Sequence, residues 1–431
     1  MWRSGEIEGE IAGLHVRIDQ LTSDMGLVGI AMIVKRVDEI QQHSEAQANV
    51  QAHILVNTTA ILDRLPPPMV KLAKVPKGTL AHKPWHVERR HVMNTVLEAL
   101  TRDGAPPLVG LVGGSGSGKT TAASEIIRSD EVRSAFAGGI VWLTVNDGAK
   151  ERLPPLMRQL ARMVYEIVGK SVGRPPAQSD DGTAYIKRFV ERGHGGKGSK
   201  CLVVADNVWE EEVISKLLET GMSVLVSTRH EELVTGAGGE AVRVDELSEE
   251  DAELLLTKAA ELPQAARLPD AAVDLVELCG RVAMDLAFVG RWSTVRGRED
   301  RDAWSEAAGK VHAEIDKIGC DPENETAESS HVTWRKAILR AGFEDLAVGS
   351  EDKRVPRLYL ALSVIPDGHE FTVKDAAVLL FDREFSAEDE ASVGKVVDIL
   401  ESWTILRPKK GTYQMLDAHS TFAREKLMDR G

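Results

Sequence analysis

One stretch of the sequence has the residue types and spacing of a phosphate-binding loop. Residues 113–120 read GGSGSGKT and fit G-x-x-x-x-G-K-[ST] at every fixed position. Glycines let backbone N–H groups wrap a phosphate chain, and Lys119 can reach the β and γ phosphates. The Thr120 hydroxyl is a suitable Mg²⁺ ligand beside those phosphates. The apolar residues 108–112 before the loop, and a helical pattern after it, predict the strand and helix N-terminus that this chemistry needs.

An acid at the end of a second apolar run is the candidate for the metal. Residues 201–205 are apolar and are followed by Asp206. A carboxylate at the C-terminal end of a neighbouring parallel strand faces the crevice that holds the phosphates, so we expect Asp206 to organise Mg²⁺, directly or through water. The alternative is an ordinary acid at a strand end. The run 223–227 leads to Arg229, which could contact a γ-phosphate or be a solvated surface residue.

The strands that would position these residues alternate with helical patterns. Apolar runs of strand length occur at 108–112, 139–145, 201–205, 223–227 and 241–244. Strands that are almost wholly apolar are buried on both faces, as in a parallel sheet covered by helices. We therefore predict an α/β domain over residues 86–245.

The segment before this domain has a helical pattern. Apolar positions in residues 1–65 recur with a period near that of a coiled coil. A small bundle within the chain is favoured over an intermolecular coiled coil, because Gly13, Gly26 and Gly29 weaken the helix. A run of prolines then begins a linker over residues 66–85.

The segment after the α/β domain is mainly helical. Residues 246–325 carry helical patterns, and Ser248 is expected to cap the first helix. Residues 331–431 mix short helices with strand-like runs at 404–407 and 412–415. The sequence thus predicts a multidomain protein in which an α/β domain precedes helical domains.

Composition argues against several classes of protein. A net charge of −14 argues against a protein built around nucleic acid or an anionic membrane. Cys201, Cys279 and Cys320 are an odd number and far apart, which indicates a reducing compartment. No signal-peptide pattern is apparent, and the longest apolar run, residues 25–34, is too short to span a bilayer. We expect a cytoplasmic protein without a membrane span.

The order of the motifs resembles the NB-ARC class of STAND NTPases, which contains plant disease-resistance proteins and the apoptotic protease-activating factor. The sequences that carry the resemblance are GGSGSGKTT from 113, LVVADNVW from 202, VLVSTR from 224, VDELS from 244, LYLALSVIP from 358 and YQMLD from 413. It covers residues 86–430. It implies a P-loop nucleotide-binding domain at 86–245, a helical ARC1 domain at 246–325 and a winged-helix ARC2 domain at 331–431.

The resemblance also implies a ligand and a site. An adenine nucleotide, ADP or ATP with Mg²⁺, would be held by Gly113, Gly114, Ser115, Gly116, Ser117, Gly118, Lys119, Thr120, Thr121, Arg229 and Asp417. The residues that act on its phosphates would be Lys119, Asp206 and Arg229, with Thr120 and Asp206 at the metal. Members of the class are locked by ADP as inactive monomers, and exchange for ATP lets them self-associate. The N-terminal helical segment would bind protein partners, in defence or stress signalling.

Three positions depart from the class. Asn207 stands where a second acid is common, and an amide cannot accept a proton, so hydrolysis is expected to be slow. Residues 281–285 read RVAMD and lack the usual proline. Leu416 stands at the position of a histidine that contacts the ADP β-phosphate, with His419 nearby but out of register. Alternatively, Leu416 is a core residue of the terminal helix.

Three functions remain open at this stage. The first is a nucleotide-gated signalling switch with at most slow ATPase activity. The second is a nucleotide-bound scaffold without turnover, which Asn207 supports. The third is a winged-helix DNA-binding regulator, disfavoured because residues 331–431 hold 15 basic and 17 acidic side chains. The twelve histidines show neither H-E-x-x-H nor a Cys/His ligand spacing, so no structural metal site is predicted.

Overall fold

A computed structural model describes a part of the chain that includes the whole predicted α/β sheet. The described residues are Gly13, 72–102, 107–168, 182–191, 200–263, 267–296, 301–318, 327–349, 352–381, 384–409 and 411–429. The chain divides into two compact units, Met1–Val70 and Lys71–Gly431. Apart from Gly13, the predicted N-terminal helical segment lies outside the described residues, so the following concerns the second unit.

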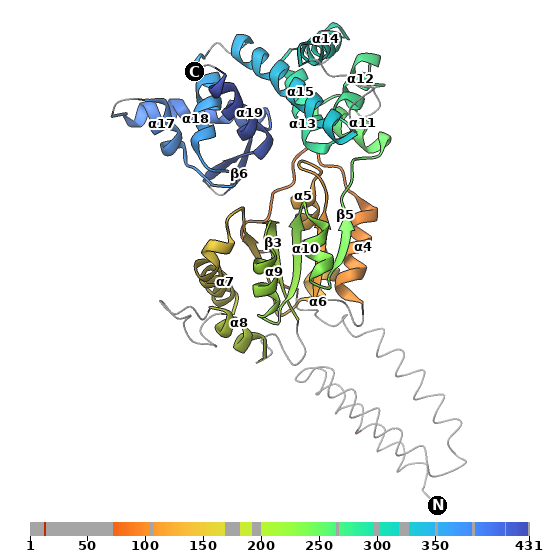
Figure 1. Ribbon diagram of the computed structural model, residues 1–431, viewed down its shortest axis with the longest axis vertical. Coiled ribbons are helices and arrows are strands. Elements are labelled where there is room, and N and C mark those ends of the chain that lie inside the picture. Colours follow the sequence, from red (N-terminus) through yellow and green to blue (C-terminus); the bar gives the residue numbers. More distant parts are fainter. Residues whose placement is uncertain are drawn as a thin grey trace, which may run out of the picture. The chain divides into compact units, whose positions relative to one another are not determined.

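A five-stranded parallel sheet forms the first part of this unit (Figure 1). Its strands are β1 Leu108–Val112, β2 Gly139–Thr144, β3 Cys201–Val208, β4 Ser223–Thr228 and β5 Glu240–Arg243. Their spatial order is β2-β3-β4-β1-β5, and every neighbouring pair is parallel. The predicted parallel sheet is therefore confirmed, and its order brings the C-terminal ends of β1, β3 and β4 together.

Helices cover both faces of the sheet because alternate strand residues point in opposite directions. Leu108 and Val112 pack in one core, and Val109 and Leu111 pack in the other. The first core includes residues of α7 Leu153–Val168, α8 Gly182–Glu191, α9 Glu211–Leu218 and α10 Glu231–Gly236. The second includes residues of α4 Arg90–Thr101, α5 Lys119–Ile126 and α6 Asp130–Ala135. A 3₁₀ turn at Lys150–Arg152 precedes α7.

The rest of the unit is mainly helical and shares one hydrophobic core. The elements are α11 Glu249–Ala259, α12 Asp270–Leu278, α13 Ala283–Arg296, α14 Arg301–Ile318, α15 Ala327–Gly349, α16 Arg354–Ala361, a 3₁₀ turn at Leu362–Val364, α17 Val373–Leu380, α18 Ala387–Ser402, β6 Leu406–Lys409, β7 Thr412–Met415 and α19 Asp417–Met428. Ser248 caps α11 as expected, accepting a 3.1 Å hydrogen bond from the Asp251 N–H. No described helix has both the length and the hydropathy needed to cross a membrane.

Two boundaries near the C-terminus differ from the sequence-based expectation. Helix α15 runs through residue 331, the expected start of the last domain, and packs against both α14 and α16. The first strand of the hairpin begins at Leu406 instead of 404, because Thr404 has a left-handed φ of 60° that ends the α18 segment. β6 and β7 pair antiparallel, and Phe371 bridges to Tyr413 beside them.

His419 is a polar residue within the helical core. Its ring packs against Phe288 and Tyr359, and its Nδ1 lies 3.1 Å from the Tyr359 hydroxyl. Burial, assisted by the charge of Arg335, lowers the His419 pKa to about 3. The imidazole is therefore neutral throughout the physiological range.

We expect this histidine to reduce stability in mild acid. Its folded pKa lies below the ordinary value of 6.5, so the unfolded chain binds the proton more readily, and stability present above pH 6.5 is lost as the pH falls. Between pH 7.5 and 5.5 the loss from this group is about 1.4 kcal/mol. Urea unfolding at both pH values should show this loss in the wild type relative to His419→Asn. Equal pH dependence of the two proteins would contradict the assignment.

Candidate functional site

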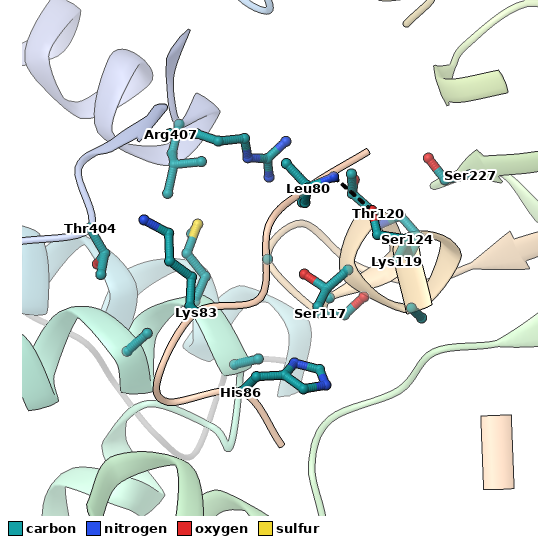
Figure 2. Close-up of a pocket in the computed structure, with 18 of the residues that line it drawn as sticks. Leu80, Lys83, His86, Ser117, Lys119, Thr120, Ser124, Ser227, Thr404 and Arg407 are labelled. Atoms are coloured by element: carbon teal, nitrogen blue, oxygen red, sulfur yellow. Dashed lines mark hydrogen bonds between the residues drawn. The ribbon is translucent and has the colours of Figure 1, made fainter. Parts of the chain in front are cut away.

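A cavity of about 520 Å³ lies at the C-terminal ends of the parallel strands. Its walls come from the segment before α4, the loop after β1, the ends of β2, β3 and β4, α13 and the C-terminal hairpin. Figure 2 shows Lys119, Thr120 and Ser227 on one side, Thr404 and Arg407 on the other, and Lys83 between them. We call residues 72–89, which precede α4, the entry segment. The volume suits a ligand of nucleotide size.

The loop after β1 needs glycine at two positions for steric reasons. Gly118 has a φ of 103°, a left-handed conformation that side chains disfavour, and it is the residue from which α5 begins. A Cβ on Gly113 would lie 2.4 Å from the Val244 carbonyl oxygen. The remaining predicted loop residues line the cavity, namely Ser115, Gly116, Ser117, Gly118, Lys119, Thr120 and Thr121. Gly113 and Gly114 are not among the lining residues but contribute their carbonyl groups.

Lys119 is held inside this loop without a carboxylate in direct contact. Its ammonium donates to the carbonyl oxygens of Gly113 and Gly114, at 2.9 and 2.7 Å. Burial, and secondarily the charge of Arg229, lowers its pKa to about 8. A bound anion would offset both effects, because its negative charge stabilises the protonated form of Lys119.

The two residues predicted at the metal are in contact. The Thr120 hydroxyl donates to Asp206 Oδ1 at 2.8 Å, and the Ser227 hydroxyl donates to the same oxygen at 2.6 Å. Asp206 itself is buried. A hydroxyl and a carboxylate beside a phosphate-binding loop are oxygen donors that fit Mg²⁺, directly or through water.

Asn207 follows in a left-handed conformation, with a φ of 64°. Its backbone N–H donates to the Ser227 hydroxyl at 2.9 Å, and its side-chain oxygen accepts from the Trp209 indole N–H at 3.0 Å. The amide lines the cavity. An amide at this edge can orient a ligand or water but cannot act as a general base.

Arg229 joins the loop to the C-terminal helix. Its guanidinium donates to the Ser115 hydroxyl at 3.3 Å and to Asp417 Oδ2 at 3.1 Å. It also lies over the Trp209 ring, 4.8 Å from the centroid. Burial raises the pKa of Asp417, and the charge of Arg229 opposes that rise. Two residues that the sequence placed far apart therefore form one ion pair.

Helix α13 also contacts the phosphate-binding loop. The Met284 N–H donates to the Gly116 carbonyl oxygen at 3.2 Å, although the proline expected near this position is absent. Arg335 binds Asp285 and donates to the Ser115 carbonyl oxygen at 3.2 Å. Sequence reasoning missed Arg335, because nothing local marks a residue on α15 as a partner of a loop 220 positions away.

Leu416 lines the cavity at the start of α19, whereas His419 lies in the core with Tyr359. Sequence reasoning also missed Trp209 and residues 72–86 of the entry segment, whereas residues 87–89 resemble the adenine-side entry motif of the NB-ARC class. Trp209 directly follows β3, so an aromatic three residues after Asp206 was an available signal. The entry segment gave no periodic signal, because it is extended and irregular.

Comparisons with known proteins agree with this geometry. Residues 89–264 match the NB-ARC domain family. A probable disease resistance protein of Arabidopsis thaliana is 24% identical over 293 residues, which are 64% of this chain and 31% of that protein. The crystal structure of a STAND protein with a tetratricopeptide repeat sensor from Pyrococcus horikoshii matches with a TM-score of 0.50 and 14% identity, over 82% of this chain and 44% of that one. Residues 89–264 therefore resemble NB-ARC domains, and the fold of the chain is similar to that of the Pyrococcus horikoshii protein.

These matches span less than half of either relative's length, at 31% and 44%. The NB-ARC family is a family of nucleotide-binding domains, which agrees with the loop and the cavity.

We expect Arg229 and Asp417 to couple energetically. Each side chain is 33% exposed, so screening limits the pair to about 1 kcal/mol. Urea unfolding of Arg229→Gln, Asp417→Asn and the double variant gives the coupling energy. The matched control is the Lys77–Glu166 pair, exposed by 78% and 63%, whose coupling should be near zero. Additive effects of Arg229→Gln and Asp417→Asn would contradict the contact.

Proposed function

We propose that this protein is a nucleotide-gated signalling switch of the NB-ARC type. In its closed state it binds ADP between the sheet and the C-terminal elements; exchange for ATP opens it and permits self-association. The observation that carries the proposal is the position of Arg229, which contacts both Ser115 of the phosphate-binding loop and Asp417 of α19. If the Arg229 guanidinium contacts a γ-phosphate as well as α19, its contacts differ between the ADP and ATP states. A switch requires such a difference, because a ligand shifts an equilibrium only by its differential affinity for the two states.

Each predicted residue has a role in this proposal. The loop residues Gly113–Thr121 surround the phosphates, and Lys119 gives up its two carbonyl partners to oppose their charge. Mg²⁺ held by Thr120 and Asp206 would neutralise charge on the phosphates. In the ADP state Asp417 keeps its ion pair with Arg229. In the ATP state Arg229 binds the γ-phosphate instead.

The wider organisation is proposed from the resemblance. The helices that follow the sheet form a helical ARC1 domain, and the elements after α15 form a winged-helix ARC2 domain whose wing is the β6–β7 hairpin. The N-terminal segment, residues 1–65, binds protein partners. The setting is cytoplasmic defence or stress signalling, for which the Arabidopsis disease resistance protein gives support.

Leu416 weakens the ADP lock in this proposal. It brings an apolar side chain to the cavity where a histidine donor would meet the β-phosphate. Asp417 still supplies an ionic contact with Arg229, so closure persists but is less tight than in the class.

A non-hydrolysing nucleotide-bound scaffold is the second candidate. The observation that favours it is Asn207, whose amide oxygen already accepts the Trp209 indole N–H. Without a base to polarise water, nucleotide would be held and not turned over.

Nucleotide binding is tested by Lys119→Ala. Loss of the ammonium removes charge-assisted contacts to two phosphates, so affinity for ADP and ATP should fall on the order of a hundredfold by calorimetry. Lys317→Ala is the control, because Lys317 is 66% exposed on α14 and does not line the cavity. Unchanged nucleotide affinity in Lys119→Ala would show that this loop does not bind the nucleotide.

Turnover separates the switch from the scaffold, because a slow but measurable rate supports the switch and a rate of zero supports the scaffold. We expect wild-type ATP hydrolysis below about 1 s⁻¹ and faster hydrolysis by Asn207→Asp, which supplies the missing acid while tolerating the left-handed backbone. Asn207→Ala removes the amide without adding a base and should not be faster. Wild-type turnover well above that rate, or no gain in Asn207→Asp, would contradict the role given to this position.

A further inference from the structure

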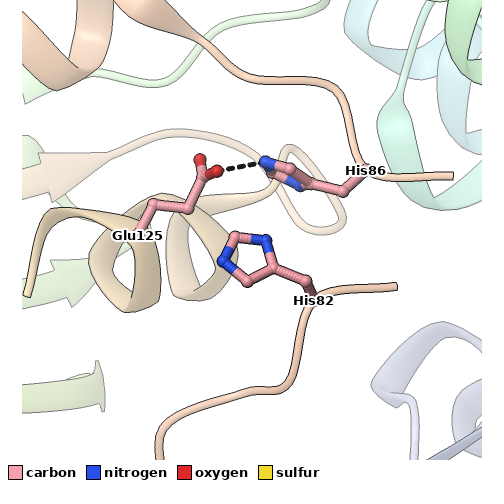
Figure 3. A group of neighbouring side chains, drawn as sticks. All are labelled: His82, His86 and Glu125. Carbon is pink, nitrogen blue, oxygen red and sulfur yellow. Dashed lines mark ion pairs between the residues drawn. The ribbon is translucent and has the colours of Figure 1, made fainter. Parts of the chain in front are cut away.

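Two histidines and a glutamate that line the cavity lie close together. Figure 3 shows His82 and His86 of the entry segment facing Glu125 of α5. One potential ligand atom from each of the three residues lies within 4.8 Å of the others. The imidazole rings are 5.1 Å apart between centroids and nearly perpendicular, at 74°. His86 Nε2 forms an ion pair with a Glu125 carboxylate oxygen.

The backbone holds these side chains together. A turn closed by the His86 N–H and the Lys83 carbonyl oxygen, at 3.0 Å, turns the chain between the two histidines. The Leu80 N–H donates to the Ser124 hydroxyl at 3.2 Å, and Arg128 donates to the Leu80 carbonyl oxygen. The entry segment is thereby attached on either side of Glu125, so the cluster does not depend on free side-chain motion alone.

The pair at the centre of the cluster is sheltered from water. The side chains of His86 and Glu125 are 18% and 11% exposed, whereas His82 is exposed. A sheltered carboxylate is costly unless positive charge compensates it. A divalent cation between the three groups supplies that charge.

We propose that His82, His86 and Glu125 bind a divalent first-row transition metal, with Zn²⁺ the foremost choice. Zn²⁺ bonds to imidazole nitrogen and carboxylate oxygen at about 2.0–2.2 Å, and two histidines with one glutamate are a recurrent zinc ligand set. Tetrahedral geometry puts ligand atoms about 3.4 Å apart. The exposed His82 would therefore rotate toward the pair, while His86 Nε2 and the Glu125 carboxylate, which are in direct contact, would move apart to admit the metal. Three protein ligands leave a fourth position for water or another ligand.

The donor set separates this site from the one at Thr120 and Asp206. Imidazole nitrogen selects transition metals, whereas Mg²⁺ prefers oxygen. Bound metal would fasten the entry segment to α5, the helix that begins with Lys119. The inference goes beyond the proposed function, because it requires no nucleotide.

Calorimetric titration of the chelator-treated full-length protein with Zn²⁺ tests the site. Excess Mg²⁺ throughout occupies oxygen sites. We expect one tight Zn²⁺ equivalent in the wild type that weakens at least tenfold in His82→Ala and in Glu125→Gln. His91→Ala is the matched control, since His91 is exposed on α4 and outside the cluster. Lys119→Ala should keep the zinc equivalent, which distinguishes failure of this site from failure of the nucleotide site.

Two further readouts guard against a folding artefact. Without metal, His82→Ala should melt at the wild-type temperature, because its side chain is exposed. Zn²⁺ should raise the melting temperature of the wild type and of His91→Ala but not that of His82→Ala. Identical zinc isotherms for the wild type, His82→Ala and Glu125→Gln would overturn the proposal, as would the absence of a tight equivalent in the wild type.

Discussion

Positive charge gathers at the C-terminal edge of the parallel sheet, and the surrounding structure is arranged to hold it there. Lys119 is confined by two carbonyl oxygens, Arg229 lies close enough to lower its pKa, and α5 begins at the same point. Asp206 and Asp417 offset this charge from two sides. The arrangement is that of an anion site, since two neighbouring cations and a helix N-terminus favour an anion between them.

Basic side chains around the cavity connect segments that are distant in the sequence. Arg229 reaches the loop and α19, Arg335 reaches the loop and α13, and Lys258 of α11 donates to the His86 carbonyl oxygen at 2.9 Å. Each contact contributes little free energy by itself, because its side chains are partly exposed to solvent. Together they make the cavity a junction, so a ligand that alters the charge there alters the contacts of several segments. A gated response requires this coupling.

The sheet and the pairing of Thr120 with Asp206 could be predicted from the sequence because their signals are local. The run 108–112 and the loop after it encode a strand, a turn and a helix start, and Asp206 ends a similar run. The contacts of Arg335, the zinc-type cluster around Glu125 and the course of α15 through residue 331 could not be predicted. They depend on which helix packs beside the loop, and neither periodicity nor spacing contains that information. The hairpin start at Leu406 was missed for a smaller reason, the left-handed turn at Thr404.

The identity of the nucleotide that copurifies with the full-length protein tests the central claim most directly. Ion-exchange chromatography of the supernatant from denatured wild-type protein should release an adenine nucleotide, predominantly ADP, in near-stoichiometric amount, and Lys119→Ala should release little. This result would place an adenine nucleotide in the cavity between the sheet and α19. A wild-type protein that releases no nucleotide and fails to bind added ADP or ATP would contradict the account.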